Sequence, residues 1–320
     1  MTSTSRIFPA TANSVDKAKD LLRQGKLVAF PTETVYGLGG DATNDRAVAA
    51  IYEAKGRPTF NPLIIHVHKA SSLDKIIVWN EKAKKLADKF WPGPLTLILP
   101  RTPECPVSLL ASAGLETLAV RIPAHPVALE LLRAVDLPIA APSANASGKL
   151  SPTTPEHVAD SLGENINMIL DGGKTTVGIE STVLDLTSPL PTILRPGGIT
   201  KEQLAEIIGE VTDRAEDEKI KGPGMLTSHY APNLPLRLNA TSATDNEALL
   251  CFGPADHVKG GKIRLNLSNS SDLGEAAANL FNMLRQLDQM HYAAIAVMPI
   301  PDIGIGIAIN DRLKRAAAPR

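Results

Sequence analysis

The sequence predicts a protein of two domains, each of which combines helices with strands. Its 320 residues exceed the length of one typical domain. Short apolar runs that suit strands alternate with segments that begin at a helix-capping residue. A polar stretch that becomes rich in glycine and proline, residues 209–233, divides the chain. We therefore expect a larger domain over residues 1–208, a linker over residues 209–233, and a smaller domain over residues 234–320.

Capping residues mark the helix starts in the N-terminal part. Ser14, Asn44, Asn80 and Thr200 are expected to cap helices that end near residues 24, 54, 90 and 208, and Pro126 opens one that ends near residue 135. Another helix is expected to end near residue 162. The apolar runs between them predict strands over residues 26–30, 63–67, 95–99, 117–122, 138–141, 168–170 and 192–195, and one ending at residue 186.

The C-terminal part alternates strands with helices. Strands are expected over residues 249–252, 262–267 and 294–298, and helices over residues 272–290 and 308–317. This alternation is typical of a small α/β layer domain with a largely parallel sheet. The sequence shows no internal repeat, metal-ligand cluster, Walker loop or serine-nucleophile elbow.

Composition excludes several classes of protein. The formal net charge is −1, so the chain is not a polycation that coats nucleic acid, and 4% aromatic residues argue against a broad base-stacking platform. Cys105 and Cys251 are far apart in sequence and suggest neither a disulfide framework nor a metal site. The sequence offers no apolar run long enough to cross a bilayer and no signal-peptide core near Met1. We expect a cytoplasmic protein that does not enter membranes.

Two cations stand close together at the end of the second predicted helix. Lys55 and Arg57 are separated by one glycine, and in an extended chain their side chains would converge on one target. Asn61 and His66 follow, the latter within a predicted strand. This group suits a phosphate-bearing ligand, whereas the alternative is a solvated turn. If the cations bind phosphate, alanine at either position is expected to abolish most turnover with little loss of stability.

Hydroxyl groups alternate in the segment that follows the first predicted strand. Thr32, Thr34 and Tyr36 would share one face if residues 31–40 were extended. The segment then forms either a polar-faced edge strand or a row of hydrogen-bond donors that faces a small polar ligand.

Further polar groups lie at or near predicted strand ends. Arg121 interrupts an apolar strand, so it must pair with an internal acid or face an anionic ligand. Ser143 and Asn145 lie in a turn of small residues that could bind phosphate or could be a plain turn. Arg195 ends a strand beside two glycines.

The linker contains two adjacent ring side chains, His229 and Tyr230. A passive tether does not require them. They either belong to a segment that folds over a ligand pocket or pack at the interface between the domains.

Five groups of residues, in order along nearly the whole chain, resemble the signature of the YrdC-like family. They are Pro31-Thr32-Glu33-Thr34-Val35-Tyr36-Gly37-Leu38, Lys55 with Arg57, Ser143 with Asn145, Gly178-Ile179-Glu180-Ser181-Thr182, and the linker with the ending Ala308-Ile309-Asn310-Asp311-Arg312-Leu313. The last group is similar to the longer, two-domain L-threonylcarbamoyladenylate synthases of the family.

The resemblance implies an α+β N-terminal domain, with a twisted mixed sheet around a basic pocket, and a smaller C-terminal Rossmann-like α/β domain. It implies a nucleotidyltransferase that joins L-threonine, bicarbonate and ATP and releases pyrophosphate. Mg²⁺ would be held mainly by the ATP phosphates, with no metal site on the protein. A downstream transferase complex would pass the threonylcarbamoyl group to the adenosine next to the anticodon of tRNA, so tRNA would be an indirect partner.

The resemblance also implies roles for individual residues. Lys55 and Arg57 would be catalytic. The residues on the ATP side would be Arg57, Asn61, Thr117, Ser143, Asn145, Ser151, Arg195 and Tyr230. The residues on the threonine side would be Thr32, Thr34, Tyr36, His66, Arg121, the backbone of Ala141, and Ser181.

Two features leave alternatives open. The linker has Leu226, Thr227 and Ser228 where members of the family often carry basic or aromatic residues, so this linker lacks a cation there. Related domains have a basic concave face, which makes a double-stranded RNA-binding module the alternative function. A third possibility, the YrdC-like part of a hydrogenase maturation factor, requires zinc-finger cysteines and a carbamoyl-phosphate-processing domain that the sequence lacks.

Overall fold

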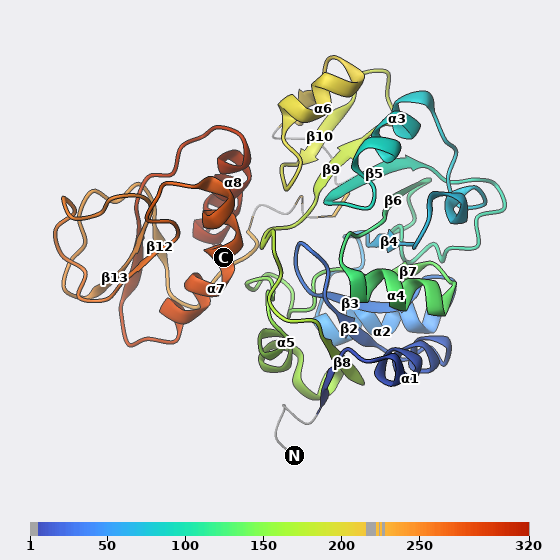
Figure 1. Cartoon of the computed structure of the whole chain (residues 1–320), viewed down its shortest axis with the longest axis horizontal. Helices are drawn as coiled ribbons and strands as arrows, with labels where there is room; N and C mark the ends of the chain where they lie inside the picture. The colour runs from blue at the N-terminus through green and yellow to red at the C-terminus, as the bar shows by residue number, and fades with distance from the viewer. Residues whose placement is uncertain (1–5, 216–221, 224, 226–227, 320) are drawn as a thin grey trace.

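The computed structural model describes residues 6–215, 222–223, 225 and 228–319. The described strands form two sheets, one of eleven strands and one of four. The large sheet is built from the N-terminal part of the chain and the small sheet from the C-terminal part, which forms a separate lobe (Figure 1). The expected combination of helices with strands is confirmed in both parts.

The large sheet is mixed, with parallel and antiparallel neighbours in the order β1-β8-β2-β3-β7-β4-β6-β5-β9-β10-β11. Because β5 is antiparallel to β6 and parallel to β9, and β10 is antiparallel to β9, β10 runs in the same direction as β4 and β6. These three strands therefore end at the same edge of the sheet. The strands are β1 (Ile7–Pro9), β2 (Val28–Phe30), β3 (Gly37–Asp41), β4 (Ile64–His66), β5 (Leu95–Pro100), β6 (Thr117–Arg121), β7 (Ile139–Ala140), β8 (Met168–Asp171), β9 (Thr182–Asp185), β10 (Thr192–Arg195) and β11 (Thr212–Asp213).

The helices of this part begin mostly where the capping residues predict. Asn44, Asn80 and Thr200 each accept hydrogen bonds from the first turn of their helices. Ser14 does not cap the first helix, because Thr11 takes that position and Ser14 completes a reciprocal capping box with it. The helices are α1 (Ala12–Arg23), α2 (Asp45–Lys55), α3 (Glu81–Phe90), α4 (Pro126–Val135), α5 (Pro155–Leu162) and α6 (Lys201–Ile208).

The expectation of an extended hydroxyl row over residues 31–40 is wrong for its first half. The Thr32 hydroxyl accepts hydrogen bonds from the backbone N–H groups of Thr34 and Val35, which closes a turn. The strand β3 starts only at Gly37. Gly39 shows why glycine is needed there, since a Cβ would lie 2.8 Å from the Phe30 ring.

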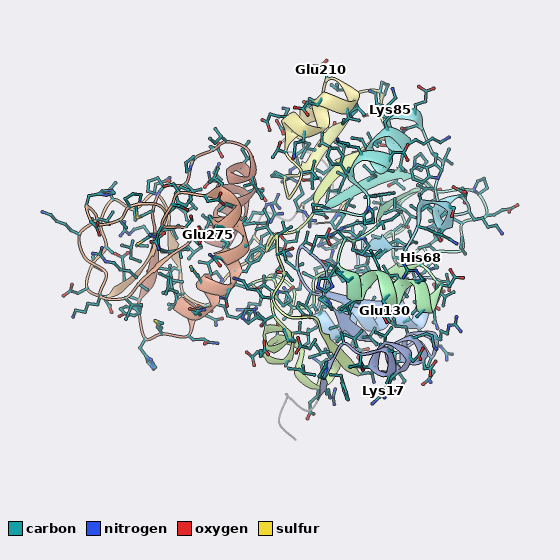
Figure 2. All side chains as sticks on the ribbon, viewed as in Figure 1. Lys17, His68, Lys85, Glu130, Glu210 and Glu275 are labelled. Atoms are coloured by element: carbon teal, nitrogen blue, oxygen red, sulfur yellow. The ribbon has the colours of Figure 1, made fainter. Side chains whose placement is uncertain are left out.

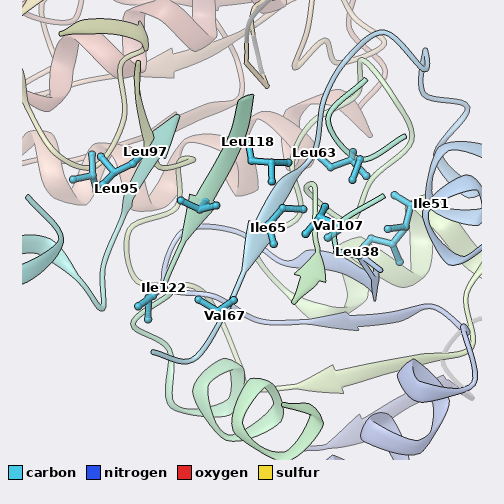
Figure 3. Packing of buried hydrophobic residues seen from close by; sticks show 14 of the residues in the cluster. Leu38, Ile51, Leu63, Ile65, Val67, Leu95, Leu97, Val107, Leu118 and Ile122 are labelled. Carbon is cyan, nitrogen blue, oxygen red and sulfur yellow. The ribbon is translucent and has the colours of Figure 1, made fainter. Parts of the chain in front are cut away.

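An apolar core holds the central strands in place (Figure 3). Ile65 on β4, Leu97 on β5 and Leu118 on β6 are each at most 1% exposed. Burial of such a side chain contributes about 1.5–3 kcal/mol to folding. The packed core therefore fixes the positions of the polar residues at the ends of these strands.

The small sheet is entirely parallel, in the order β12-β15-β13-β14, which confirms the prediction for the C-terminal part. The last helix begins at Ile305, earlier than residue 308, and Gly304 precedes it with a φ of 51°. The elements are β12 (Leu236–Arg237), β13 (Glu247–Cys251), β14 (Arg264–Asn266), α7 (Leu273–Asp288), β15 (Ala294–Val297) and α8 (Ile305–Ala317).

The two parts of the chain pack closely against each other. Val35, Leu150 and Ile179 of the N-terminal part belong to the same apolar cluster as the core of the C-terminal part. Gly178 has a φ of 76°, and a Cβ on it would lie 2.4 Å from the Cα of Ala278 on α7. Helices α7 and α8 therefore lie directly against the loops that precede β9.

Exposed charges of both signs are spread over the surface, as Lys17, Lys85, Glu130 and Glu210 illustrate (Figure 2). Within the described residues, we find no helix with the length and apolar character needed to cross a membrane.

Candidate active site

Polar residues converge at the edge where β4, β6 and β10 end. His66, Arg121 and Arg195 are the last residues of these three strands, and His66 lies opposite Arg121 in the parallel register. Together with neighbouring loops they border a cavity with free space of about 50 Å³. This cavity is therefore smaller than ordinary ligand pockets, which measure about 300–1,000 Å³. The residues around it are Thr32, Thr34, Val35, Gly37, Arg57, Ile64, His66, Arg121, Ala141, Pro142, Ser143, Glu180, Ser181, Arg195, Pro223, His229 and Tyr230.

Buried cations gather around this cavity. Among the described residues, the buried lysine and arginine side chains all lie at it or next to the residues that border it. They are Lys55, Arg57, Arg121, Arg195, Arg312 and Arg315. A charged group is expensive to bury without a partner, so the partner of each cation decides what the site can bind.

Lys55 is not part of an extended pair of cations, contrary to expectation. It is the last residue of α2, and Gly56 follows in the left-handed conformation with a φ of 58°. The Lys55 ammonium donates to the carbonyl oxygens of Ser143 and Asn145, at 2.5 Å each. Burial, and then the nearby Arg57, lower the pKa of Lys55 well below its ordinary value. Lys55 therefore fixes the loop behind the cavity wall and does not itself border the cavity.

Arg57 borders the cavity directly. Its Nε donates to the Asn61 carbonyl oxygen at 3.1 Å, and Nη2 donates to the Pro62 carbonyl oxygen at 2.9 Å. Burial lowers the pKa of Arg57 to about 10, which leaves it charged at neutral pH. Neutral carbonyl partners orient the guanidinium without cancelling its charge.

Arg195 is held in the same way. Its Nε and Nη2 donate to the Ser181 carbonyl oxygen at 3.2 and 2.9 Å, and Nη2 also reaches the Ser181 hydroxyl at 3.2 Å. That hydroxyl is hydrogen-bonded to Thr96 on β5 at 2.7 Å. Arg57 and Arg195 thus present positive charge to the cavity, with carbonyl groups as their hydrogen-bond partners.

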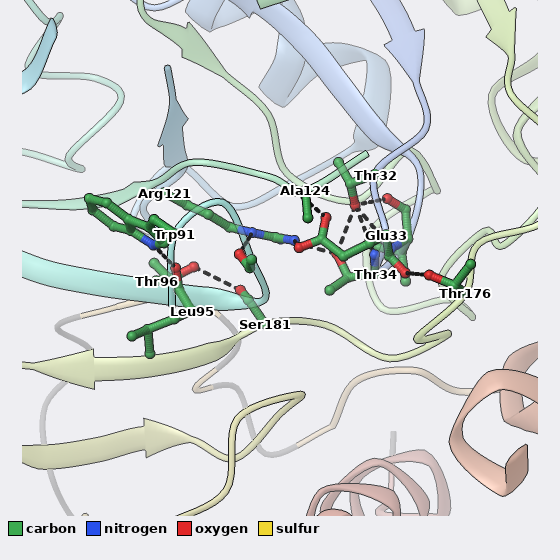
Figure 4. A network of polar contacts seen from close by, with 12 residues as sticks. Thr32, Glu33, Thr34, Trp91, Leu95, Thr96, Arg121, Ala124, Thr176 and Ser181 are labelled. Carbon is green, nitrogen blue, oxygen red and sulfur yellow. Dashed lines mark hydrogen bonds and ion pairs between the residues drawn. The ribbon is translucent and has the colours of Figure 1, made fainter. Parts of the chain in front are cut away.

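Arg121 has an acidic partner, which is the first of the two alternatives that the sequence left open. Its Nη2 lies 2.7 Å from Glu33 Oε1, and both side chains are buried. Its Nε donates to the Gly93 carbonyl oxygen and Nη1 to the Thr34 hydroxyl (Figure 4). The backbone N–H of Ala124 donates to the other oxygen of Glu33. This corner of the cavity is therefore polar and charge-balanced.

Glu180 borders the cavity, and like Glu33 it has an arginine partner. Arg312, on α8 of the C-terminal part, donates from Nε to Glu180 Oε2 at 2.7 Å. The Ser151 hydroxyl donates to Oε1 at 2.5 Å. Although burial alone raises the pKa of Glu180, Arg312 and Arg195 lower it below its ordinary value. Glu180 is therefore ionised at neutral pH.

Asn61 and His66 are fully enclosed polar groups. Neither amide atom of the Asn61 side chain has a hydrogen-bond partner, although the residue is 0% exposed. Such a group is a candidate to meet a ligand. His66 contacts the Ile64 carbonyl oxygen through Nδ1 at 3.2 Å, and burial lowers its pKa to about 3, so the imidazole is neutral.

The segment between the two sheets closes the cavity. Pro223, His229 and Tyr230 border it, and the rings of His229 and Tyr230 lie 4.1 Å apart between centroids. Tyr230 has a φ of 61°, a strained value for a bulky residue. Burial, and then Arg57, lower the pKa of His229, whose Nδ1 has no partner. Leu226 and Thr227 lie outside the described residues.

The structure brings many of the expected site residues to one place. Ten border the cavity: Thr32, Thr34, Arg57, His66, Arg121, Ala141, Ser143, Ser181, Arg195 and Tyr230. Four are buried but are not part of the cavity wall: Lys55, Asn61, Asn145 and Ser151.

Two expected residues are not brought to the cavity. Tyr36 points elsewhere, because its hydroxyl donates to the Gly173 carbonyl oxygen at 2.7 Å. Thr117 pairs with Pro100 at the start of β6, whereas Arg121 at the other end of the strand borders the cavity.

Sequence reasoning missed the roles of Glu33, Glu180 and Arg312. Glu33 and Glu180 lie inside the recognised motifs, but their partners are 88 and 132 residues away and no local pattern indicates them. The requirement that a buried arginine have a partner was the one available signal, and it applied to Arg121.

Two protein-family models match consecutive parts of the chain. A family model described as "Telomere recombination", which covers the Sua5, YciO and YrdC proteins, matches residues 20–197. A second, described as "Threonylcarbamoyl-AMP synthase, C-terminal domain", matches residues 199–318.

Several relatives match over nearly the whole chain. The threonylcarbamoyl-AMP synthase of Bacillus subtilis is 45% identical over 96% of this chain and 93% of its own length. That of Pyrococcus abyssi is 41% identical over 95% and 94%. The structure of P. abyssi Sua5 complexed with L-threonine superposes with a TM-score of 0.90 at 38% identity and covers 97% of both chains. The chain therefore belongs to the Sua5 and YrdC family, in the two-domain form that carries the threonylcarbamoyl-AMP synthase C-terminal domain.

Proposed function

We propose that the cavity joins L-threonine, bicarbonate and ATP into L-threonylcarbamoyl-AMP and releases pyrophosphate. This is the first step of threonylcarbamoyladenosine formation in tRNA, and it makes the chain a nucleotidyltransferase. The observation that carries the proposal is the pair of buried guanidinium groups at the cavity, Arg57 and Arg195, which carbonyl oxygens orient. A ligand with several negative charges, such as a triphosphate, would offset the cost of keeping Arg57 and Arg195 buried with carbonyl partners.

The reaction suits a site without a covalent nucleophile. The amine of threonine attacks the carbon of bicarbonate or of carbon dioxide derived from it, and loss of water or of a proton gives a carbamate. A carbamate oxygen then attacks the α-phosphorus of ATP, and the bond between the α-phosphorus and the oxygen that bridges it to the β-phosphorus breaks. Both electrons of that bond leave with pyrophosphate. Such a transfer depends on positioning and on neutralising charge, which fixed guanidinium groups supply.

The charge-balanced corner around Arg121 is proposed as the threonine site. Arg121 would bind the carboxylate through the Nη1 that now donates to Thr34. Thr34, Ser181 and the backbone of Ala141 would surround the rest of the amino acid. The relative described as complexed with L-threonine supports this part of the proposal. Tyr36 and Thr117 are left out, since neither borders the cavity.

The positive side around Arg57 and Arg195 is proposed as the ATP site. Both guanidinium groups would contact phosphates, and Ser143 and the unpartnered amide of Asn61 would contact the nucleotide. Asn145 and Ser151 would complete the site from behind the wall. Lys55 is proposed to support catalysis by holding the loop of Ser143, since its ammonium already has two acceptors.

Residues 209–233 are proposed to be a lid between the catalytic domain, residues 1–208, and a Rossmann-like accessory domain, residues 234–320. A space of about 50 Å³ cannot hold ATP and threonine, so Pro223, His229 and Tyr230 must withdraw when the ligands enter. On closing again over the ligands, the lid would exclude water from a reactive adenylate. Hydrogen exchange tests the lid, because ATP with threonine should protect this segment, and protection that the ligands leave unchanged would mean that it is only a linker.

Mg²⁺ is proposed to arrive with ATP. Within the described residues, no group of three histidine, cysteine, aspartate or glutamate side chains could hold a metal ion. Glu180 at the cavity and Glu33 beside it are both paired with arginines. The chemistry of the donors therefore fits an ion held by the phosphates, whose charge it would help to neutralise.

The decisive experiment is pyrophosphate release from ATP, measured with and without threonine and bicarbonate, with the adenylate identified by mass. Release that needs both supports the proposal. RNA binding without ATP turnover would instead support the double-stranded RNA-binding module. The product would pass to a threonylcarbamoyl transferase complex that modifies tRNA.

A further inference from the structure

We propose that Arg312, in the C-terminal part of the chain, is a positioning residue of the ATP site that neutralises Glu180 and turns it away from the phosphates. Glu180 borders the cavity, and Arg312 does not. The proposal rests on the ATP site proposed above. It assigns a task within the reaction to the C-terminal part, which otherwise has no stated role in it.

The contacts show how Arg312 controls the Glu180 carboxylate. Arg312 Nε donates to Oε2 at 2.7 Å, and Ser151 donates to Oε1 at 2.5 Å. Both oxygens are therefore engaged by the protein. The Arg312 side chain is 1% exposed and that of Glu180 is 7% exposed, so little water competes for the pair. Loss of Arg312 would leave Oε2 without this donor at the wall of the cavity.

The position of Glu180 explains why it needs a cation. It lies next to Ser181, whose carbonyl oxygen holds Arg195, and Arg195 itself lowers the pKa of Glu180. An unpaired carboxylate here would attract Arg195 and repel a triphosphate through a medium of low dielectric constant. With Arg312 in place, the charge of Glu180 is balanced within the protein, and Arg195 keeps its carbonyl partner.

Arg312 is also in contact with the segment that closes the cavity. Its guanidinium carbon lies 5.1 Å from the centre of the Tyr230 ring. Asp311 holds Arg312 Nη1 at 2.6 Å and Arg315 Nε at 2.9 Å, which fixes both arginines on α8. The remaining amino group, Nη2, is buried without a hydrogen-bond partner. The same arginine thus contacts Glu180 on the cavity wall and Tyr230 on the segment that covers it.

The test is a double-mutant cycle in the full-length protein, with ATP affinity measured by calorimetry in the absence of threonine. Arg312→Met should weaken ATP binding by about tenfold or more, because Glu180 is left buried and uncompensated. Adding Glu180→Gln should restore the affinity to within about threefold, although the double variant has also lost the ion pair. Arg312→Lys should retain much of the affinity. The KM for threonine should change far less than the KM for ATP.

A matched control removes an arginine from a glutamate elsewhere in the C-terminal part. Arg237 pairs with Glu247 at 2.7 Å, and neither residue borders the cavity. Arg237→Met should leave the ATP affinity unchanged. If Arg312→Met does not fold, Arg312→Lys and the double variant Arg312→Met with Glu180→Gln still give the comparison, because neither leaves an uncompensated carboxylate.

Three results would overturn the inference. The first is ATP affinity of Arg312→Met equal to that of the unmodified protein. The second is a double variant as weak as Arg312→Met, which would mean that Arg312 acts through packing or touches the nucleotide itself. The third is an equal loss in Arg237→Met. Failure of the ATP site itself is recognised separately, since Arg57→Ala would then bind ATP normally.

Discussion

Replacement of Lys55 by methionine tests how the cavity is built. The sequence alone predicts that Lys55 binds a phosphate group, so that its replacement abolishes most turnover and leaves stability intact. The structure predicts a different result. The Lys55 ammonium binds the carbonyl oxygens of Ser143 and Asn145, and the Lys55 carbonyl accepts from the backbone N–H of Ser147. Methionine keeps the length of the side chain and the backbone bond, but it leaves the buried Asn145 carbonyl without this donor, whereas the Ser143 carbonyl still accepts from the backbone N–H of Asn145 at 3.0 Å.

The expected loss of stability follows from the Asn145 carbonyl. A buried acceptor left without a partner costs about 1–3 kcal/mol. Loss of the ammonium also removes its own desolvation cost, which the lowered pKa of Lys55 reveals. We therefore expect the free energy of unfolding to fall by about 1–2 kcal/mol, near the lower end of that range. For a domain of about 200 residues, this corresponds to a melting temperature lower by about 2–8 °C.

Calorimetric melting and ATP affinity, measured on the same preparation, separate the two predictions. Lys82→Met is the matched control, because the Lys82 ammonium binds the Pro189 carbonyl oxygen at 3.0 Å on the exposed surface. That variant should melt within about 1 °C of the unmodified protein. If Lys55→Met melts as the unmodified protein does and still loses turnover, the reasoning fails and Lys55 binds phosphate directly.

Three other perturbations give measurable outcomes. Asn61→Leu should raise the free energy of unfolding by about 1–2 kcal/mol, because it removes an unpartnered buried amide, and should weaken ATP binding; a less stable protein with normal ATP affinity would contradict this. Valine should be a much poorer substrate than threonine and serine a moderate one, because a site that hydrogen-bonds a hydroxyl strongly rejects the isostere without it; equal kcat/KM for valine and threonine would refute the assigned site. The pKa of His66 is 6.5 in the unfolded chain and about 3 in the folded protein, so the unfolded state takes up the proton first as pH falls. The free energy of unfolding should therefore decline as pH falls from about 6.5 toward 3, by up to about 1.4 kcal/mol per pH unit. His66→Gln should flatten this slope in melts between pH 7 and 4, and an unchanged slope would exclude His66 as a cause.

Local sequence signals predicted most helices because their causes are local. Asn44 and Asn80 bond the first turns of their own helices, and Pro126 stands at a first helical position where it needs no hydrogen bond. Strand β3 could not be predicted in this way. The strand is rich in glycine, a residue that disfavours strands. Glycine is nevertheless required at position 39, because the Phe30 ring and the side chain of Ile139 leave no room for a Cβ on Gly39.

The candidate site was only partly predictable, because the partner of each cation lies far away in sequence. Lys55 and Arg57 are close neighbours in the chain and look equivalent. Their difference depends on Ser143 and Asn145, whose carbonyl groups the fold brings to Lys55 from 88 and 90 residues away. No local spacing rule predicts such distant partners. The end of helix α2 at Lys55, in contrast, could have been predicted from the sequence, since Gly56 is a typical C-terminal cap.

The partners of the cations divide the cavity into two electrostatic environments. Arg57 and Arg195 are oriented by carbonyl oxygens, which leave their charges available to an anionic ligand. Arg121 is balanced by Glu33, which gives a polar corner of no net charge. L-threonine is a zwitterion with no net charge, and ATP carries several negative charges. If L-threonine binds at Arg121 and ATP at Arg57 and Arg195, as proposed, each substrate meets the environment that matches its own charge, and this match would orient both substrates before any chemical step.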